Sequence, residues 1–178
     1  MLFTETAVTT STVYSGRLLS VRRDEVRLDN GNIAGREVVE HPGGVAVVAV
    51  TNDGKIICER QFRYAAGCEL LEIPAGKLEQ GEDPLAAIQR ELSEETGYTA
   101  ANWRSLGKML PTPAYCEEIT YLFLATDLTP GDAHLDTNEF LSVCELPLNE
   151  LIDMIMANDI SDAKTIAGIL KAERILRD

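Results

Sequence analysis

Hydrophobic and polar residues alternate through the first part of the chain, as in strands that are exposed on one face. The alternation is clearest over residues 13–28, and Asp29-Asn30-Gly31 then supplies residues that accept the positive φ of a tight hairpin. Residues 35–40 are predicted as the returning strand, ending at His41-Pro42-Gly43-Gly44. No helical pattern accompanies these strands, so residues 1–42 are predicted to form an antiparallel β extension that packs on the main body or on a second subunit.

The pattern changes from Gly44 onward, where helical periodicity joins the strands. Residues 45–50 are continuously apolar, which predicts a strand covered on both faces. Further strands are expected at residues 55–61, 70–73, 103–109, 118–125 and 140–145, and helices at residues 83–96, 148–157 and 162–177. This order favours an α/β fold of the α+β type, a mixed β-sheet sandwich with flanking helices in residues 43–178, over a doubly wound sheet.

The composition is that of a globular protein, with 45% apolar and 25% charged residues among 178. A formal net charge of −13 argues against a nucleic-acid partner, but it allows a phosphate substrate if a divalent cation reverses the local sign. No stretch is apolar over the length that a membrane span needs, and residues 1–5 lack the features of a secretory signal. We therefore expect a cytoplasmic protein with no membrane partner.

The cysteines are expected to be structural. Cys58, Cys68, Cys116 and Cys144 form no C-x-x-C motif, which gives little support to a zinc site. Each is predicted to act as a small, buried apolar residue in a reducing compartment.

The helix expected at residues 83–96 has clear end signals. Asp83 is predicted as its N-cap, Pro84 suits the first turn, and Gly97 suits the C-terminal cap. Its apolar stripe, expected to face the sheet, consists of Leu85, Ile88 and Leu92.

Three glutamates share one side of this helix, because Glu91, Glu94 and Glu95 have the spacing i, i+3 and i+4. Like charges at this spacing destabilise a helix by about 0.2–0.5 kcal/mol per pair, and the helix dipole disfavours anions near the C-terminus. A divalent cation removes both costs, and Mg²⁺ prefers such carboxylate ligands. The alternative is a solvated acidic face in which Arg90 pairs with Glu94.

The helix and the loop before it resemble the signature of the Nudix hydrolases: Gly, five residues, Glu, seven residues, then Arg-Glu-apolar-x-Glu-Glu-x-Gly-apolar. The matching residues are Gly76, Glu82, Arg90, Glu91, Leu92, Glu94, Glu95 and Gly97, while Tyr98 is aromatic where an aliphatic residue is usual. The resemblance implies the Nudix fold, with this segment as its loop-helix-loop, and hydrolysis of a nucleoside diphosphate linked to another group.

The same resemblance implies roles for individual residues. Glu91 and Glu95, with Glu94 close behind, match the Mg²⁺ ligands, and the backbone carbonyl of Ala75 matches a further ligand; Mn²⁺ is a possible substitute. Arg90 matches a residue that orients these carboxylates. Glu82 either ligates a metal through water or braces the loop.

Segments on both sides of the motif resemble the ADP-ribose pyrophosphatases. Upstream these are Glu59-Arg60-Gln61-Phe62-Arg63 and Glu72-Ile73-Pro74-Ala75-Gly76. Downstream, residues 111–118 resemble that subfamily's loop, with Thr112-Pro113-Ala114 where Ser-Pro-Gly is usual.

These segments supply the candidate substrate contacts. Arg63 is expected to clamp the diphosphate in the bidentate way of a guanidinium, with Arg36 as a weaker candidate. Glu72 is expected to brace the site or to act as a ligand, with an exposed surface position as the alternative, and Pro113 is expected in the substrate-binding loop. Glu118 matches a glutamate that activates water or holds a metal, and Glu117 or a motif glutamate are the alternatives.

The subfamily implies a homodimer with exchanged N-terminal strands and a nucleoside diphosphate sugar substrate, with ADP-ribose favoured. Hydrolysis of another such sugar, for example GDP-mannose, is the nearest alternative. A nucleotide sensor without activity and an acidic metal buffer are less favoured, because the motif glutamates are all retained and no Asp/Asn-rich EF-hand loop is present.

Overall fold

The computed structural model describes residues 3–135 and 137–177. The chain divides into two compact units. The N-terminal unit consists of residues up to 43 together with residues 110–119, and the main unit consists of residues 44–109 and the chain from residue 120 onward. The segment 110–119 therefore lies with the N-terminal strands although the strands on both sides of it belong to the main unit.

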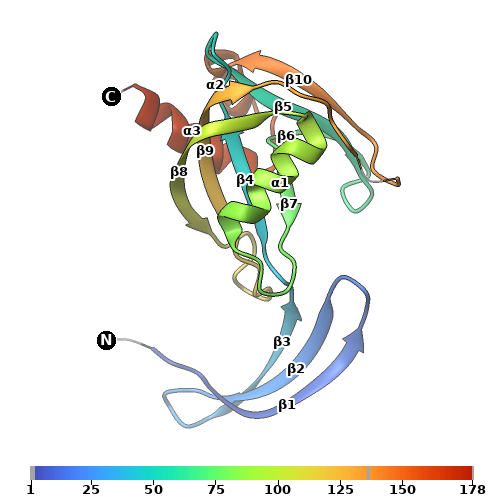
Figure 1. The fold of residues 1–178 in the computed structure, drawn as a ribbon. Coiled ribbons are helices and arrows are strands. Elements are labelled where there is room, and N and C mark those ends of the chain that lie inside the picture. Colours follow the sequence, from blue (N-terminus) through green and yellow to red (C-terminus); the bar gives the residue numbers. More distant parts are fainter. Residues whose placement is uncertain (1–2, 136, 178) are drawn as a thin grey trace. The chain divides into compact units, whose positions relative to one another are not determined.

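The N-terminal unit is built on one antiparallel sheet in the order β1-β2-β3 (Figure 1). Its strands are β1 (Thr6–Ser15), β2 (Ser20–Arg27) and β3 (Ile33–Glu40). The alternation over residues 13–28 belongs to two strands, because the chain reverses between them with a hydrogen bond from Gly16 N to Leu19 O of 2.9 Å. The predicted hairpin is confirmed, since Gly31 has φ 83° and donates to Leu28 O at 2.8 Å.

The segment 110–119 is hydrogen-bonded to β3. Val39 N donates to Tyr115 O at 2.7 Å, and Glu117 N donates to Val39 O at 3.0 Å. Arg22 on β2 strengthens this attachment, because its Nη2 lies 2.6 Å from a carboxylate oxygen of Glu117.

The main unit contains two sheets. The larger has the order β7-β4-β9-β8, in which β4 and β9 are parallel and the other neighbours antiparallel, and the smaller is the antiparallel sheet β10-β5-β6. The strands are β4 (Gly44–Ala49), β5 (Lys55–Arg63), β6 (Cys68–Glu72), β7 (Ala75–Lys77), β8 (Thr99–Met109), β9 (Thr120–Thr129) and β10 (Leu141–Pro147).

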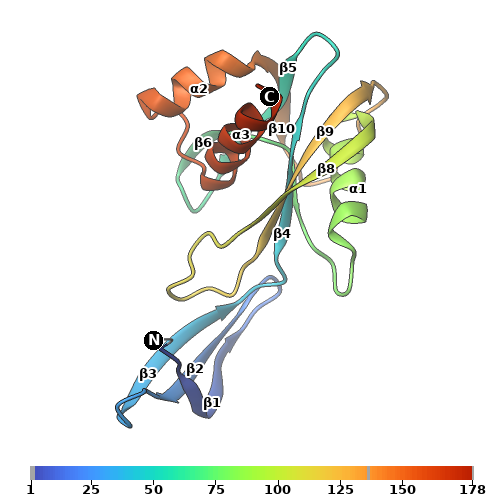
Figure 2. The same ribbon diagram turned by 90° about the vertical axis from the view of Figure 1, so that its left-hand side faces the viewer.

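Three helices flank these strands. Helix α1 (Pro84–Thr96) covers one face of β4, and α2 (Leu148–Ala157) and α3 (Ala163–Leu176) lie on the opposite side (Figure 2). None of the described helices is long and apolar enough to cross a membrane. The predicted mixed α+β architecture with flanking helices is confirmed.

Strand β4 is buried along its whole length, as its unbroken apolar sequence predicts. Ala46 and Val48 belong to the core that includes residues of α2 and α3, whereas Val45 and Val47 belong to the core beneath α1. Because successive strand residues point to opposite faces, this one strand joins both cores. The helix α1, which carries the glutamates, is thereby packed on a strand that is buried on both faces.

Candidate active site

Helix α1 forms as its end signals predict. The Asp83 carboxylate accepts from Leu85 N and Ala86 N, Pro84 occupies the first position, and Gly97 takes φ 75° at the C-cap. The sheet-facing side is buried at Ala87, Ile88 and Leu92. Leu85 was expected on that face, but it is 37% exposed because it lies in the first turn, beyond the contact with the sheet.

Arg90 lies at the centre of the carboxylates of the motif. Its Nη1 is 3.0 Å from Glu91 Oε1 and 3.0 Å from Glu94 Oε2, and its Nε is 3.2 Å from Glu82 Oε1. Glu82 also accepts from the backbone N–H of Glu79 at 3.0 Å. This geometry supports the orienting role expected for Arg90 and the bracing alternative for Glu82.

Glu95 faces inward and meets Glu59, a strand residue that the sequence reasoning had not singled out as an acid of the site. Both residues are 4% exposed, and their carboxyl groups are hydrogen-bonded to each other. Burial, together with the charges of Glu59, Glu91 and Glu139, raises the pKa of Glu95 well above its ordinary value. Burial likewise raises the pKa of Glu59 above its ordinary value, so the pair favours a shared proton over two charges.

Gly76 lies directly against the side chain of Glu91. A Cβ atom at this position would overlap the carboxylate of Glu91, so only glycine allows that approach. Burial raises the pKa of Glu91, and Arg90 opposes this rise.

These residues line a cavity of about 340 Å³ in the main unit. Its lining is polar and includes six of the expected site residues, Arg63, Ala75, Arg90, Glu91, Glu94 and Glu95. It also includes Glu139, from the segment between β9 and β10. The sequence reasoning missed Glu139 because a single acid in a loop has no periodicity to mark it.

Glu72 lies beside the cavity rather than in its lining. Its carboxylate receives two hydrogen bonds of 2.7 Å from Nε and Nη2 of Arg63, and a further one from Lys164. The side chain is only 3% exposed. Both of its oxygens are therefore engaged within the protein.

The remaining predicted residues, Arg36, Pro113, Glu117 and Glu118, belong to the N-terminal unit. Arg36 pairs with Glu5 at 2.5 Å and lines a cavity of about 390 Å³ with Arg23 and Tyr115.

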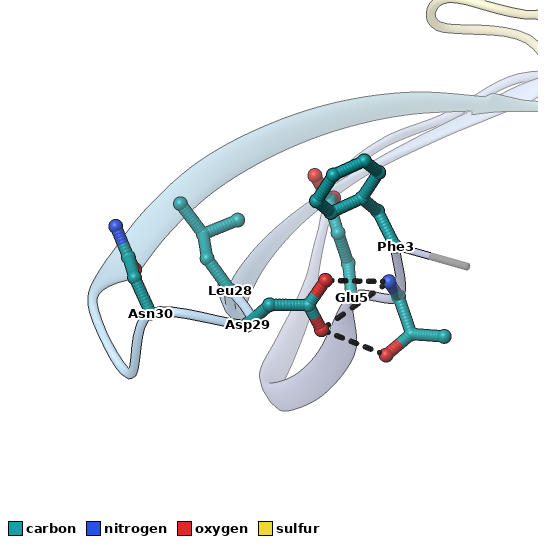
Figure 3. A pocket seen from close by; sticks show the side chains of 6 residues that line it. Phe3, Glu5, Leu28, Asp29 and Asn30 are labelled. Atoms are coloured by element: carbon teal, nitrogen blue, oxygen red, sulfur yellow. Dashed lines mark hydrogen bonds between the residues drawn. The ribbon is translucent and has the colours of Figure 1, made fainter. Parts of the chain in front are cut away.

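A further cavity of the N-terminal unit lies between residues 3–5 and the β2–β3 turn (Figure 3). There the Asp29 carboxylate accepts from the backbone N–H and the hydroxyl of Thr4, at 3.2 and 3.1 Å. These bonds attach the start of the chain to the turn, and no predicted site residue is part of this cavity.

The donor set of the main cavity suits a hard divalent cation, because carboxylate and carbonyl oxygens are the ligands that Mg²⁺ and Mn²⁺ prefer. Glu59 Oε1 is buried without a hydrogen-bond partner, which a cation or its water would supply. Among the described residues, no group of three or more acidic, histidine or cysteine side chains is already placed to hold a metal ion. The reason is that Arg90 engages Glu82, Glu91 and Glu94, while Glu95 turns to Glu59.

The fold and this site define a Nudix hydrolase, and the chain belongs to the NUDIX domain family, whose model matches residues 40–168. Residues 5–39 match the N-terminal domain of nucleoside diphosphate sugar hydrolases. Nudix hydrolases generally use divalent metal ions.

Relatives align over most of the chain. The ADP-ribose pyrophosphatase of Bacillus subtilis (strain 168) is 40% identical, covering 93% of this chain and 90% of the relative. The methanol dehydrogenase activator of Bacillus methanolicus is 41% identical over 94% of this chain and 92% of the relative. A GDP-mannose pyrophosphatase of Citrobacter koseri is 30% identical over 74% and 73%. A crystal structure of an ADP compounds hydrolase matches with a TM-score of 0.85 and 25% identity, over 97% of this chain and 94% of that one.

Proposed function

We propose that this protein hydrolyses the diphosphate of ADP-ribose to AMP and ribose 5-phosphate. The observation that carries the proposal is the polar cavity in which an arginine, Arg63, faces the clustered carboxylates of the motif. A diphosphate needs both cationic groups and a metal to bind in so acidic a site. The relatives named as ADP-ribose pyrophosphatases support this choice of substrate.

We assign the metal to Mg²⁺, with Mn²⁺ as a possible substitute. Glu91, Glu95, Glu94 and the carbonyl of Ala75 are the residues that would hold it, and Glu95 would release its proton to do so. When bound, the ion neutralises phosphate oxygens and lowers the pKa of an attacking water. Arg90 then orients Glu91 and Glu94 through the ion pairs that it already forms.

The residues of the chain share the remaining work. Arg63 holds diphosphate oxygens, while the water oxygen forms a bond to one phosphorus and the bridging oxygen leaves with the other phosphate. The proton of the water passes to a carboxylate. We assign this step to Glu139, because it lines the cavity beside the motif glutamates. Glu118, with Glu117 as its neighbour, is the alternative that the sequence favours.

The N-terminal unit is proposed to complete a homodimer by strand exchange. Strand β1 is exposed along its whole length and carries apolar residues, including Val8, Val13 and Tyr14. Such a surface favours burial against a second subunit. Arg36 and Pro113 would then contact the nucleotide. A monomer mass by light scattering at micromolar concentration would refute the dimer.

We also propose a cytoplasmic location, because the free cysteines fit a reducing compartment.

The test of the proposed function is a comparison of ADP-ribose, GDP-mannose and dinucleoside polyphosphates as substrates, each with Mg²⁺, with Mn²⁺ and with a chelator. We expect the highest kcat/KM for ADP-ribose and no turnover with the chelator. The GDP-mannose pyrophosphatases among the relatives make GDP-sugars the second candidate. Equal or slower turnover of ADP-ribose would overturn the assignment, and unchanged turnover after chelation would overturn the metal.

A further inference from the structure

Lys164, at the start of helix α3, is placed against the helix dipole. It follows the N-cap Asp162 by two residues, and the helix dipole disfavours a cation in the first turn. The side chain is nevertheless only 17% exposed. A partly buried cation at an unfavourable helix end needs specific partners.

Those partners connect Lys164 to the cavity. Its Nζ donates to Glu72 Oε2 and lies 3.1 Å from Asp162 Oδ1. Glu72 in turn holds the guanidinium of Arg63 with two parallel hydrogen bonds of 2.7 Å. The Nε and Nη2 edge of the Arg63 guanidinium is thus held by Glu72, and its remaining nitrogen, Nη1, is available to bind a ligand.

The position of Lys164 is itself fixed by the fold. Asp162 accepts from Thr165 N at 2.9 Å and from the Thr165 hydroxyl at 2.6 Å. The same hydroxyl oxygen accepts from Ile73 N at 3.0 Å, which ties the start of α3 to the end of β6. The buried cation and Glu72 are therefore held by elements that are about ninety residues apart in the sequence.

Charge balance explains why two cations are present. Glu72 lies directly opposite Glu59 in the register of β6 and β5, so two buried carboxylates are neighbours. Burial alone would raise the pKa of Glu72, but Arg63 and Lys164 hold its pKa below the ordinary value, so Glu72 stays ionised. Without Lys164, the whole charge of Glu72 would fall on Arg63 and draw its guanidinium away from any anion in the cavity.

We propose that Lys164 is a positioning residue for phosphate binding: through Glu72 it orients Arg63 and leaves that guanidinium available to a diphosphate. The three residues form the Lys164–Glu72–Arg63 relay. This inference rests on the proposed function, since it gives Arg63 a phosphate to bind, and it assigns Glu72 to bracing rather than to direct contact with substrate.

A double-mutant cycle on the full-length protein tests the relay. The affinity for inorganic pyrophosphate in the presence of Mg²⁺ is measured by calorimetry for Lys164→Met, Arg63→Met and the double variant, and the melting temperature is measured for each. Arg63→Met is expected to weaken binding about 10- to 100-fold, as for a charge-assisted hydrogen bond. Lys164→Met is expected to weaken it about 5-fold, but by less than about 2-fold when Arg63 is already replaced.

Two further variants separate positioning from general stability. Lys171→Met, on the same helix, removes an ammonium that donates to the carbonyl of Leu106 at 2.7 Å; it should lower the melting temperature and leave affinity unchanged. Lys164→Arg should restore affinity to within about 2-fold, because it keeps the charge at the end of a long side chain.

The relay is overturned by several results. These are an unchanged affinity in Lys164→Met, an equal loss in the Arg63→Met background, a full loss in Lys171→Met, or no pyrophosphate binding by the unmodified protein. Hydrolysis of ADP-ribose is assayed separately, so a protein that binds pyrophosphate through the relay but does not hydrolyse ADP-ribose would refute the proposed substrate alone.

Discussion

Glu59 of β5 and Glu95 of α1 meet carboxyl to carboxyl, and each residue is only 4% exposed. Two buried acids in contact cannot both ionise at low cost, so one proton is retained between them. The helix that brings Glu95 to this position also places Glu91 and Glu94 on the cavity. The carboxylates of the site therefore carry more negative charge than Arg63 and Arg90, which line the same cavity, neutralise.

The first prediction concerns the stability of the metal-free protein. The pKa of Glu95 and of Glu59 is raised in the folded state, whereas both ionise near pH 4.3 when unfolded. At pH values between the unfolded pKa and the raised folded pKa, the folded protein binds more protons than the unfolded chain. Its free energy of unfolding therefore falls as pH rises. We expect a loss of about 1–3 kcal/mol from pH 5 to pH 8 from this pair, seen as a falling melting temperature in chelator.

Added Mg²⁺ should reverse this loss, because it replaces the proton between the carboxylates. The replacement Glu95→Gln should flatten the pH dependence in chelator, since it removes the group with the more strongly raised pKa. A melting temperature that rises from pH 5 to pH 8 in chelator would contradict the prediction.

The second prediction is that Glu95→Gln lowers kcat about 10²- to 10³-fold, as expected on losing a group that stabilises charge in the transition state. The melting temperature in chelator at pH 8 should not fall, because glutamine has no proton to lose. Steady-state kinetics and thermal unfolding check the two statements. Glu69→Gln, at an exposed position of β6, is the matched control and should change neither.

The third prediction compares two glutamates as acceptor of the proton from water. Glu139→Gln should lower kcat about 10²- to 10³-fold, the usual contribution of a general base. Glu118→Gln should have the smaller effect if Glu139 has this role. The pH profile of kcat, measured for both variants, identifies the base as the residue whose loss removes the acidic limb. A larger loss in Glu118→Gln would assign the step to the N-terminal unit.

The fourth prediction concerns the last glycine of the motif. A Cβ at Gly97 would lie 2.5 Å from the carbonyl oxygen of Gly131, and the residue has φ 75°. Gly97→Ala should therefore destabilise the protein by about 2–4 kcal/mol, the left-handed backbone accounting for about 1–2. Gly54→Ala has a similar φ of 83° but open space around it, so it should cost only the backbone part. Chemical denaturation of both variants measures the difference, and equal losses would contradict it.

The fifth prediction concerns the cysteines. Burial raises the pKa of Cys58 to about 12, and the side chain is inaccessible, so its thiol should resist alkylation at pH 8 until the protein unfolds. Cys68 was predicted to be buried, but it is exposed at the start of β6, so it should react in the folded state. Mass spectrometry of peptides after timed alkylation checks this, with Cys68→Ser as the control. Rapid modification of Cys58 in the folded protein would show that its core opens.

The sequence was sufficient where periodicity was strong. Helix α2 begins and ends where expected, at Leu148 and Ala157, and the apolar run in β4 is buried on both faces. Periodicity did not reveal the turn between β1 and β2, because the alternation continues on both sides of the chain reversal at Gly16. Strand β7 was missed because its three residues, next to Pro74, have no pattern of their own.

The site was predictable in its motif and less so in its surroundings. The spacing in α1 placed Glu91, Glu94 and Glu95 on one side, and the structure brings them to one cavity with Arg63. Glu59 had a weak signal, an acid between the buried Cys58 and the exposed Arg60 on a strand. Lys164 had none, because its contact with Glu72 joins residues that only the packing of α3 on the sheet brings together.

The chain passes between the two units three times, after residues 43, 109 and 119. A fragment that starts at Gly44 would keep residues 110–119 but lose Val39, to which their backbone is hydrogen-bonded. Neither unit is therefore encoded by one continuous stretch of the gene. A swap of N-terminal segments between related enzymes must include the ten residues 110–119. Recombination during evolution faces the same rule: the first strands can be inherited as an intact unit only together with a loop encoded far downstream.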